Sequence, residues 1–227
     1  MLTLRVATAW DGRALPHASV IQLLSAGTDL LEMRCFAPFR GDPPPNGPPG
    51  PTPGLFNHEV AELFIAGPSS QYLELELGPH GHHLGLRLDG VRRPFQTAMP
   101  MRSATRRCGA GWWAGSLWFP RAWLPEGPHR VNAYRIAGQG DERSYEAAYP
   151  TLTERPDFHV LDRFAPAVLP AVGAEVDEQA AIDAAIHALG AVNPSADGAP
   201  PAAADALARW SGALVGALHA AGRAGAR

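Results

Sequence analysis

Two stretches of strictly alternating residues constrain the fold more than any other feature of this chain. Between Tyr72 and Leu77, tyrosine and glutamate occupy one set of positions and leucine occupies the other. Leucine again takes every second position in residues 84–88. Side chains of a β-strand point alternately to opposite faces, so a period of two predicts two strands, each with an apolar face. We therefore expect a fold built around a β-sheet.

The six residues between these strands, GPHGHH at 78–83, predict a hairpin. A symmetric hairpin places Leu75 opposite Leu86 and Glu74 opposite Arg87. This register joins opposite charges across the two strands, which stabilises a pair modestly.

The preceding strand is expected at residues 59–65 and has two registers to choose from. One of them buries the Glu62 carboxylate on the leucine face, which would cost several kcal/mol. We favour the other, which moves Glu62 beside Glu74 and Glu76. The sequence thus predicts one sheet face bearing Glu62, Glu74, Glu76 and Arg87.

Other apolar or alternating stretches predict further short strands, as is typical of an all-β domain. They are residues 2–9, 18–25, 29–36, 111–119, 130–137 and 143–149. Residues 41–54, GDPPPNGPPGPTPG, should leave the sheet as a polyproline-like or disordered insertion, because proline removes backbone donors. A surface insertion is the favoured interpretation, and a lid over a site is the alternative.

The composition changes to Ala, Gly and Pro from about residue 165. Residues 175–189 and 202–221 predict two helices with weak apolar stripes. We therefore divide the chain into a domain at 1–165 and an Ala-rich helical tail at 166–227. The helices could form a hairpin, dock on the domain or make a homo-oligomer.

The charge of the chain and its lack of targeting signals bear on its partners and its location. The net charge is −3 and 46% of residues are hydrophobic, which gives no reason to expect nucleic acid or a membrane surface as a partner. A secretory signal and an apolar run of about 20 residues are not found, so a cytoplasmic location is expected. In that compartment Cys35 and Cys108 should be free thiols.

Several motifs together resemble a known family: EVAELFI (59–65), YLELEL followed by PHG (72–81), SYEAAYP (144–150) and PDFH (156–159). Over about residues 1–165 the chain resembles the uncharacterised protein family 0462. That family looks like a relative of carbohydrate-binding module family 9 and DOMON-like domains. The resemblance implies an all-β fold, a two-sheet antiparallel β-sandwich of the carbohydrate-binding module family 9 type. Such sandwiches bind sugars or haem, often on a sheet face and sometimes with a structural Ca²⁺.

Four groups of residues are candidates for a site. The carboxylates Glu62, Glu74 and Glu76 with Arg87 could bind a cation or act as acid and base, although a solvated face is the commoner arrangement. Imidazoles at His80 and His82 are metal-ligand candidates, but histidines in a hairpin loop usually face solvent.

The other two groups come from later strands. Asp157 and His159 could orient an imidazole for base catalysis near Tyr145, or simply close the sandwich through hydrogen bonds. Trp112 or Trp113 should point outward by alternation and could stack on a ligand, although large rings usually pack in the core. No serine lies in a Gly-x-Ser-x-Gly turn, so a serine hydrolase is not expected.

The leading functional hypothesis is a non-catalytic β-sandwich that binds a carbohydrate or a similar polar small molecule on one sheet face. Its ligand-binding residues are predicted to be Glu62, Glu74, Glu76, Arg87, Trp112 and Tyr145. An alternative is a metal-assisted hydrolase or isomerase with catalytic candidates His80, His159, Asp157 and Glu62. A third is a protein-interaction module acting through the helical tail. No cofactor is expected, and a divalent metal is left open.

Overall fold

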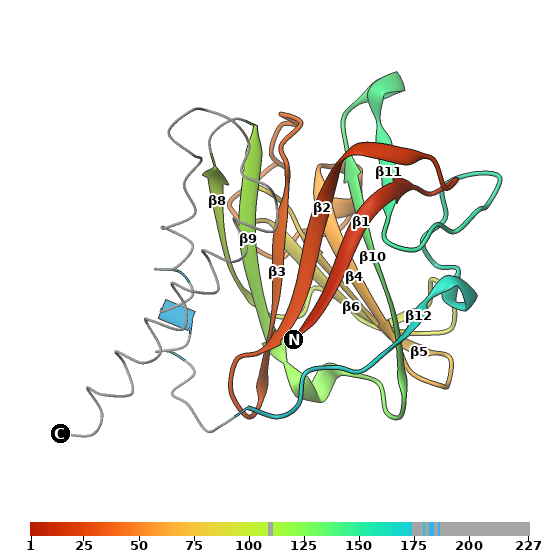
Figure 1. The fold of residues 1–227 in the computed structure, drawn as a ribbon. Coiled ribbons are helices and arrows are strands. Elements are labelled where there is room, and N and C mark those ends of the chain that lie inside the picture. Colours follow the sequence, from red (N-terminus) through yellow and green to blue (C-terminus); the bar gives the residue numbers. More distant parts are fainter. Residues whose placement is uncertain (109–110, 174–178, 180–181, 184–185, 187–227) are drawn as a thin grey trace.

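The strands of the computed structural model form one continuous antiparallel sheet that curls into two facing layers (Figure 1). The structure describes residues 1–108, 111–173, 179, 182–183 and 186. The strands are β1 (Leu2–Ala9), β2 (Ala14–Ser25), β3 (Leu30–Pro38), β4 (Val60–Ala66), β5 (Gln71–Leu77), β6 (His83–Asp89), β7 (Pro94–Gln96), β8 (Arg102–Cys108), β9 (Trp112–Pro120), β10 (His129–Ala137), β11 (Ser144–Ala147) and β12 (Ala165–Ala167). The predicted all-β antiparallel fold is confirmed.

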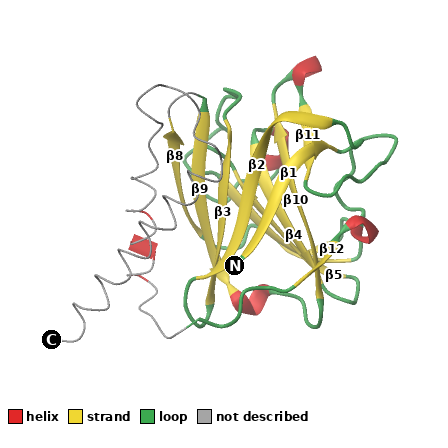
Figure 2. Ribbon diagram, in the orientation of Figure 1, coloured by secondary structure: helices red, strands yellow, loops and turns green. Residues whose placement is uncertain are grey.

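The first layer has the order β8-β9-β3-β2-β1, and the second has the order β7-β6-β5-β4-β10-β11. A short pairing of β1 with β11, at Thr8–Ala147 and Ala9–Glu146, joins the two layers. The predicted pair of sheets is therefore one curled sheet, with β7 and β8 as its edges. Figure 2 shows that the body of the molecule contains, besides strands, only short 3-10 turns and loops.

The space between the layers holds the main hydrophobic core. One residue in two along each central strand points into it, as the alternating sequence requires. Its fully buried members include Leu63, Leu73, Leu75, Leu77, Trp113, Leu117 and Phe119. Burial of large apolar side chains on this scale is the main stabilising contribution to such a fold.

The pairing of β4 with β5 follows the register that the sequence favoured. Leu63 faces Leu75 on the core side, and Glu62 faces Glu76 on the opposite side. The physical reason given for this choice was nevertheless wrong. Glu62 is only 2% exposed, so this register also buries the carboxylate.

The predicted register between β5 and β6 is wrong by one residue. His83 pairs with Leu77 and extends the strand, so that Leu86, rather than Arg87, lies opposite Glu74. A shift of one residue turns every β6 side chain to the other face. Arg87 therefore leaves the carboxylate face and lies beside Phe95 and Gln96.

A second hydrophobic cluster covers the outer face of the second layer. Phe64, Tyr72 and Tyr134 project outward from the sheet, and Phe158 stacks on Tyr134 with ring centroids 4.0 Å apart. Phe158 belongs to the segment after β11, which crosses this face before the chain reaches β12. The 3-10 turn η1 (Leu55–Asn57) covers the same face through Leu55. A face expected to be solvated is thus buried.

The proline-rich insertion at 41–54 is ordered and packs against the β5–β6 hairpin. The His83 backbone pairs with Gly50 and Thr52 at N–O distances of 3.0 and 2.8 Å. Asp42 is buried and accepts the backbone N–H of Gly138. Instead of forming an isolated polyproline arm, the insertion covers the histidine hairpin.

Most of the predicted helical tail lies outside the described residues, including the whole of 202–221. Four described positions, Gln179, Ile182, Asp183 and Ile186, are helical, and Ile182 packs against Trp118 of β9. Among the described residues, no helix is long and apolar enough to cross a membrane.

Candidate functional site

A cavity of about 460 Å³ lies on the outer face of the second layer. Its floor comes from β4, β5, β6 and β10, and its walls come from β11, the β6–β7 turn, η1 and the segment before β12. The lining residues are Phe56, Glu62, Phe64, Glu74, Leu86, Leu88, Arg92, Pro94, Ile136, Tyr145, Pro156, Asp157, Phe158 and His159. A volume of this size is within the range of small-molecule sites.

Two carboxyl groups lie in the floor of the cavity, and a third lies beside them. Glu62 and Glu74 line the cavity, and Glu76 faces Glu62 across the β4–β5 ladder. All three are almost completely buried, at 2%, 5% and 0% exposure. Oε2 of Glu74 and both carboxyl oxygens of Glu76 receive no hydrogen bond of ordinary geometry. Buried acceptors without partners are rare and call for an explanation.

Burial raises the pKa of each of these carboxyl groups. Loss of hydration raises the pKa of Glu74 to about 7, although a hydrogen bond with the Glu76 carboxyl group and, to a smaller extent, the guanidinium of Arg92 oppose the shift. Glu62 and Glu76 also have a pKa well above the usual range, first because of burial and second because a neighbouring carboxylate would repel their charge. The cluster therefore holds protons near neutrality, whereas an exposed glutamate would be ionised.

One wall of the cavity is fixed by a chain of hydrogen bonds. The backbone N–H of Arg92 donates to Oη of Tyr72 at 3.0 Å, and that hydroxyl lies 2.8 Å from Nδ1 of His159. Since Tyr72 Oη already accepts, its own proton is available to donate to Nδ1. His159 then carries its proton on Nε2, and burial lowers its pKa to about 4. Its imidazole is therefore neutral and its free nitrogen is a donor.

Asp157 holds the ends of this wall together. Its Oδ1 accepts the backbone N–H of His159 at 2.9 Å and the guanidinium of Arg92 at 2.7 Å. Asp157 thus bonds the His159 backbone and does not orient its ring, which differs from the predicted Asp–His pair. Arg92 has a φ of 56°, a conformation that residues other than glycine adopt uncommonly. No sequence pattern pointed to Arg92.

Aromatic rings surround the carboxyl floor. Phe64, Tyr145 and Phe158 line the cavity, and Phe56, which is 51% exposed, lies among its outer residues. Arg143 fixes this side by donating to the carbonyl oxygens of Phe56 and Asn57 at 2.6 and 3.2 Å. The aromatic lining joins residues from four separate segments, so sequence spacing does not reveal it.

The structure brings together only some of the predicted site residues. Glu62, Glu74, Tyr145, Asp157 and His159 line the one cavity, and Glu76 adjoins it. Arg87, Trp112, His80 and His82 do not line it. Trp112 points outward but is only 7% exposed, stacks on Phe36 and lines a smaller cavity of about 240 Å³.

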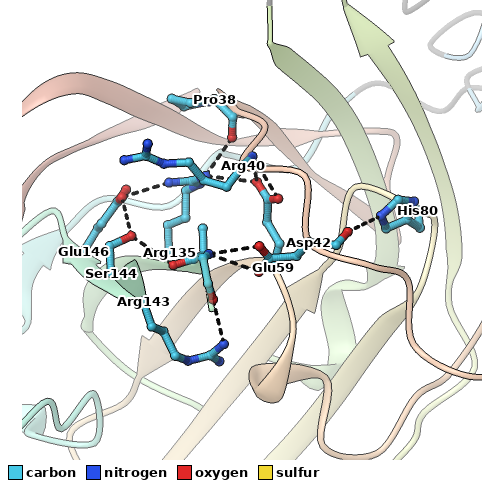
Figure 3. Close-up of polar contacts among 11 residues, drawn as sticks. Pro38, Arg40, Asp42, Glu59, His80, Arg135, Arg143, Ser144 and Glu146 are labelled. Carbon is cyan, nitrogen blue, oxygen red and sulfur yellow. Dashed lines mark hydrogen bonds and ion pairs between the residues drawn. The ribbon is translucent and has the colours of Figure 1, made fainter. Parts of the chain in front are cut away.

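The histidine hairpin is packed against the insertion, contrary to the solvent-facing loop that was expected. Nε2 of His80 donates to the carbonyl of Asp42 at 3.1 Å, and Nε2 of His82 donates to that of Gly47 at 3.3 Å. Figure 3 shows His80 turned toward Asp42. These nitrogens are occupied, which argues against a shared metal site. In the part of the chain that the structure describes, no three His, Cys, Asp or Glu side chains are grouped to hold a metal ion.

A different buried cluster lies at one end of the interlayer core (Figure 3). Arg135 of β10 donates to Glu146 at 2.8 Å and to Glu59 at 2.9 Å, and also to the carbonyl of Pro38 at 2.7 Å. Ser144 donates to Glu146 at 3.0 Å. Because Arg135 links β10 and β11 to the end of β3, this cluster ties the two layers together.

Fold and cavity together define a β-sandwich with a ligand-sized, partly polar cavity on one sheet face. The same architecture occurs in a protein from Bacteroides uniformis with a provisional carbohydrate-binding description. It is 14% identical, with a TM-score of 0.56 over 73% of this chain and 85% of that one. A family 9 carbohydrate-binding module from Caldicellulosiruptor kristjanssonii, solved with glucose, is 8% identical with a TM-score of 0.43 over 77% and 85%.

Sequence relatives identify the family directly. The chain is 40% identical over 164 residues to the UPF0462 protein C4orf33 homolog of Danio rerio, which covers 68% of this chain and 83% of the relative. It is 37% identical over 169 residues to the UPF0462 protein C4orf33 of Homo sapiens, covering 70% and 84%. No family model matches the chain. This protein belongs to the UPF0462 family, as its motifs predicted.

Proposed function

We propose that this protein binds a small polar molecule of the carbohydrate class in the cavity above Glu62 and Glu74. The observation that carries the proposal is a cavity of about 460 Å³ whose floor contains a buried carboxyl oxygen of Glu74 with no hydrogen-bond partner. A ligand hydroxyl or amine would supply the missing bond. Buried polar groups left unpaired typically cost about 1–3 kcal/mol each, so a ligand that pairs them gains affinity.

The lining suits a molecule with both polar and apolar surfaces. Protonated carboxyl groups can donate as well as accept, and Nε2 of His159 is a donor by the argument above. Phe56 and Tyr145 offer ring surfaces against which the C–H groups of a sugar can pack. The relatedness in fold to a protein with a carbohydrate-binding description supports the ligand class, as an analogy of architecture.

The test is titration calorimetry of the full chain against a panel of mono- and disaccharides, preceded by a glycan-array screen. Glu74→Gln keeps the volume of the side chain, and we expect it to change the affinity of any saccharide that binds. Glu126→Gln, on an exposed loop residue, is the matched control and should leave binding unchanged. If no saccharide binds at millimolar concentration, the proposal is wrong.

One observation favours a second candidate function, acid–base catalysis without a metal. Within one cavity the environment raises the pKa of Glu74 to about 7 and lowers that of His159 to about 4. Opposite shifts in neighbouring groups are typical of catalytic acids and bases. Glu74 would be the proton donor and acceptor, with His159 as a fixed donor. Turnover of any bound sugar that disappears in Glu74→Gln would support catalysis, and unchanged sugar after long incubation would argue against it.

A further inference from the structure

The carboxyl cluster beside the cavity forms no direct ion pair within the described residues, although Arg92 and Arg143 lie near enough to act on its charge. No arginine or histidine nitrogen forms an ion pair with Glu62, Glu74 or Glu76. The two arginines nearest the cavity are engaged elsewhere: Arg92 pairs with Asp157, and Arg143 donates to backbone carbonyls. Every other glutamate in this structure that is as deeply buried, namely Glu32, Glu59 and Glu146, does have an arginine partner. Among the described residues, the cavity floor is thus the place where deeply buried glutamates have no ion-paired arginine.

The unpaired acceptors at the cavity floor also favour a ligand that carries hydrogen-bond donors. Oε2 of Glu74 is a buried acceptor with no donor, and Glu74 lines the cavity. Both oxygens of Glu76 behind it also lack a donor of ordinary geometry, although the Phe56 backbone and the Glu74 carboxyl group lie near enough to affect its pKa. The group that best complements several acceptors is one that has donors only, and an ammonium group has up to three donors and no acceptor.

The aromatic lining supplies an independent argument. Phe64, Tyr145 and Phe158 line the cavity together with the two carboxyl groups, and Phe56 adds a fourth ring. The face of an aromatic ring attracts a cation, and the attraction is stronger where water is excluded. Carboxyl groups below and rings around the sides are the combination that binds organic cations in other proteins.

We propose that the ligand of this cavity carries a positively charged nitrogen, which lies against Glu62 and Glu74 between the rings of Phe64, Tyr145 and Phe158. This inference rests on the proposed function, since it takes the cavity as the ligand site. It narrows the ligand to an organic ammonium compound, and an amino sugar satisfies both proposals. The cation takes the place of protons that the carboxyl groups otherwise hold.

Binding should therefore be coupled to proton release. Titratable or charged groups face the cluster from every element around it. The strands contribute Glu62 (β4), Tyr72, Glu74 and Glu76 (β5), Tyr134 (β10) and Tyr145 (β11). The connecting segments contribute Arg92 (β6–β7 turn), Arg143 (just before β11), Asp157 and His159. Of these, Glu62, Glu74 and Glu76 are the carboxyl groups whose protonated form burial favours, so a bound cation should release protons from them. Affinity for a cation should rise as pH rises.

Calorimetry of the full chain with three probes tests the inference. 6-Amino-6-deoxy-D-glucose and D-glucose differ only by an ammonium in place of a hydroxyl, and an alkylamine stays protonated up to about pH 9. Tetramethylammonium is a cation without a sugar. We expect the amino sugar to bind about tenfold or more tighter than glucose near pH 8, with a smaller preference near pH 5.5. Repeating the titration in buffers of different ionisation enthalpy should reveal protons released on binding.

Glu62→Gln and Glu74→Gln should each abolish most of the preference for the amino sugar and reduce proton release, whereas Glu126→Gln should preserve both. Thermal melting of each variant checks that it is folded. Equal binding of glucose and the amino sugar would overturn the cationic ligand but leave the carbohydrate proposal intact. Binding of tetramethylammonium without either sugar would support the cationic ligand and overturn the carbohydrate class. Failure of all three probes would overturn both.

Discussion

The buried glutamates of the second layer form two clusters, and the clusters differ in whether an arginine pairs with them. At the end of the interlayer core, Glu59 and Glu146 share the guanidinium of Arg135, with N–O distances of 2.9 and 2.8 Å. On the outer face, Glu62 and Glu74 are equally buried but have no such partner among the described residues. The two clusters are close along the chain, because Glu59 directly precedes β4 and Glu62 lies within it.

The difference indicates what each cluster contributes. A buried carboxylate with a well-placed guanidinium is compensated, and removing one partner leaves a strongly unfavourable charge. A buried carboxyl group without a counter-ion remains protonated and weakens the fold when it ionises. The first arrangement holds the structure together. The second is unfavourable in the isolated molecule, and a ligand that pairs with the carboxyl groups would offset this cost.

The first layer repeats the compensated arrangement. Arg34 donates to both carboxyl oxygens of Glu32, at 2.8 and 2.9 Å, and Ser116 donates to one of them at 2.7 Å. Both charged side chains are almost fully buried. Among the described residues, the deeply buried glutamates outside the cavity floor all have an arginine partner, and those of the floor are the exception.

Arg135→Met should have the largest effect on stability. It leaves Glu59 and Glu146 buried without a cation, and breaking a buried pair in this way typically costs about 3–5 kcal/mol. Chemical denaturation measures the loss. The control adds Glu59→Gln and Glu146→Gln to Arg135→Met, which removes the uncompensated charges and should restore about half or more of the stability. A mild loss in the single variant would show that the cluster is not what joins the layers.

The pH dependence of stability should be dominated by the uncompensated cluster. Folded Glu74 keeps its proton up to about pH 7, whereas an unfolded glutamate loses it near 4.5. The folded state then binds more protons in this interval, so the free energy of unfolding falls as pH rises. The pKa values of Glu62 and Glu76 are also raised by burial and add to the fall in the free energy of unfolding.

His159 acts in the opposite direction, because its pKa falls from 6.5 to about 4 and the unfolded state therefore binds more protons between these values. Glu59 also has a raised pKa and His83 a lowered one, so four carboxyl groups oppose two imidazoles and the net trend is still downward. Denaturation at about pH 5.5 and about pH 8.5 should show a loss of a few kcal/mol at the higher pH. Stability that is flat or rises over this range would contradict the burial of uncompensated carboxyl groups.

Glu74→Gln should stabilise the protein near pH 8 and have little effect near pH 5, the opposite sign to the Arg135 variant. The amide stays neutral at both pH values, so no ionised carboxylate has to be desolvated in the folded variant. The free energy of unfolding near pH 8 should rise by about 1–3 kcal/mol. Melting temperatures at the two pH values measure it. A variant that is destabilised near pH 8 would show that the Glu74 carboxylate has a compensating partner.

Tyr72→Phe should have the smallest effect. Loss of the hydroxyl removes the donor to Nδ1 of His159 and the acceptor of the Arg92 backbone N–H. Each such bond contributes about 1 kcal/mol, and water can replace the acceptor at Arg92, which is exposed. ¹⁵N NMR of the imidazole should show a neutral ring protonated at Nε2 in the unmodified protein and a mixture of tautomers in the variant. A ring protonated at Nδ1 in the unmodified protein would mean that the hydrogen bond runs in the other direction.

Much of the fold could be predicted from local patterns. The strands around residues 59–65 and 72–77 and their register follow from alternation, because a strand with one apolar face can bury it in only one phase. The β5–β6 register could not be predicted in the same way. Counting GPHGHH as loop shifts the pairing by one residue, whereas His83 belongs to the strand, where it pairs with Leu77 and also with the insertion at 41–54.

The candidate site likewise combines features that follow from local patterns with features that depend on tertiary contacts. The sequence by itself determined that Glu62, Glu74 and Glu76 share one face, since side-chain direction in a strand depends only on position. Whether that face is open or covered depended on Phe158, His159 and Arg92, which reach it from distant segments. Burial, and with it the raised pKa of the carboxyl groups, is a property of what packs over a residue. Alternation fixes the direction of a side chain, but only tertiary contacts fix its environment.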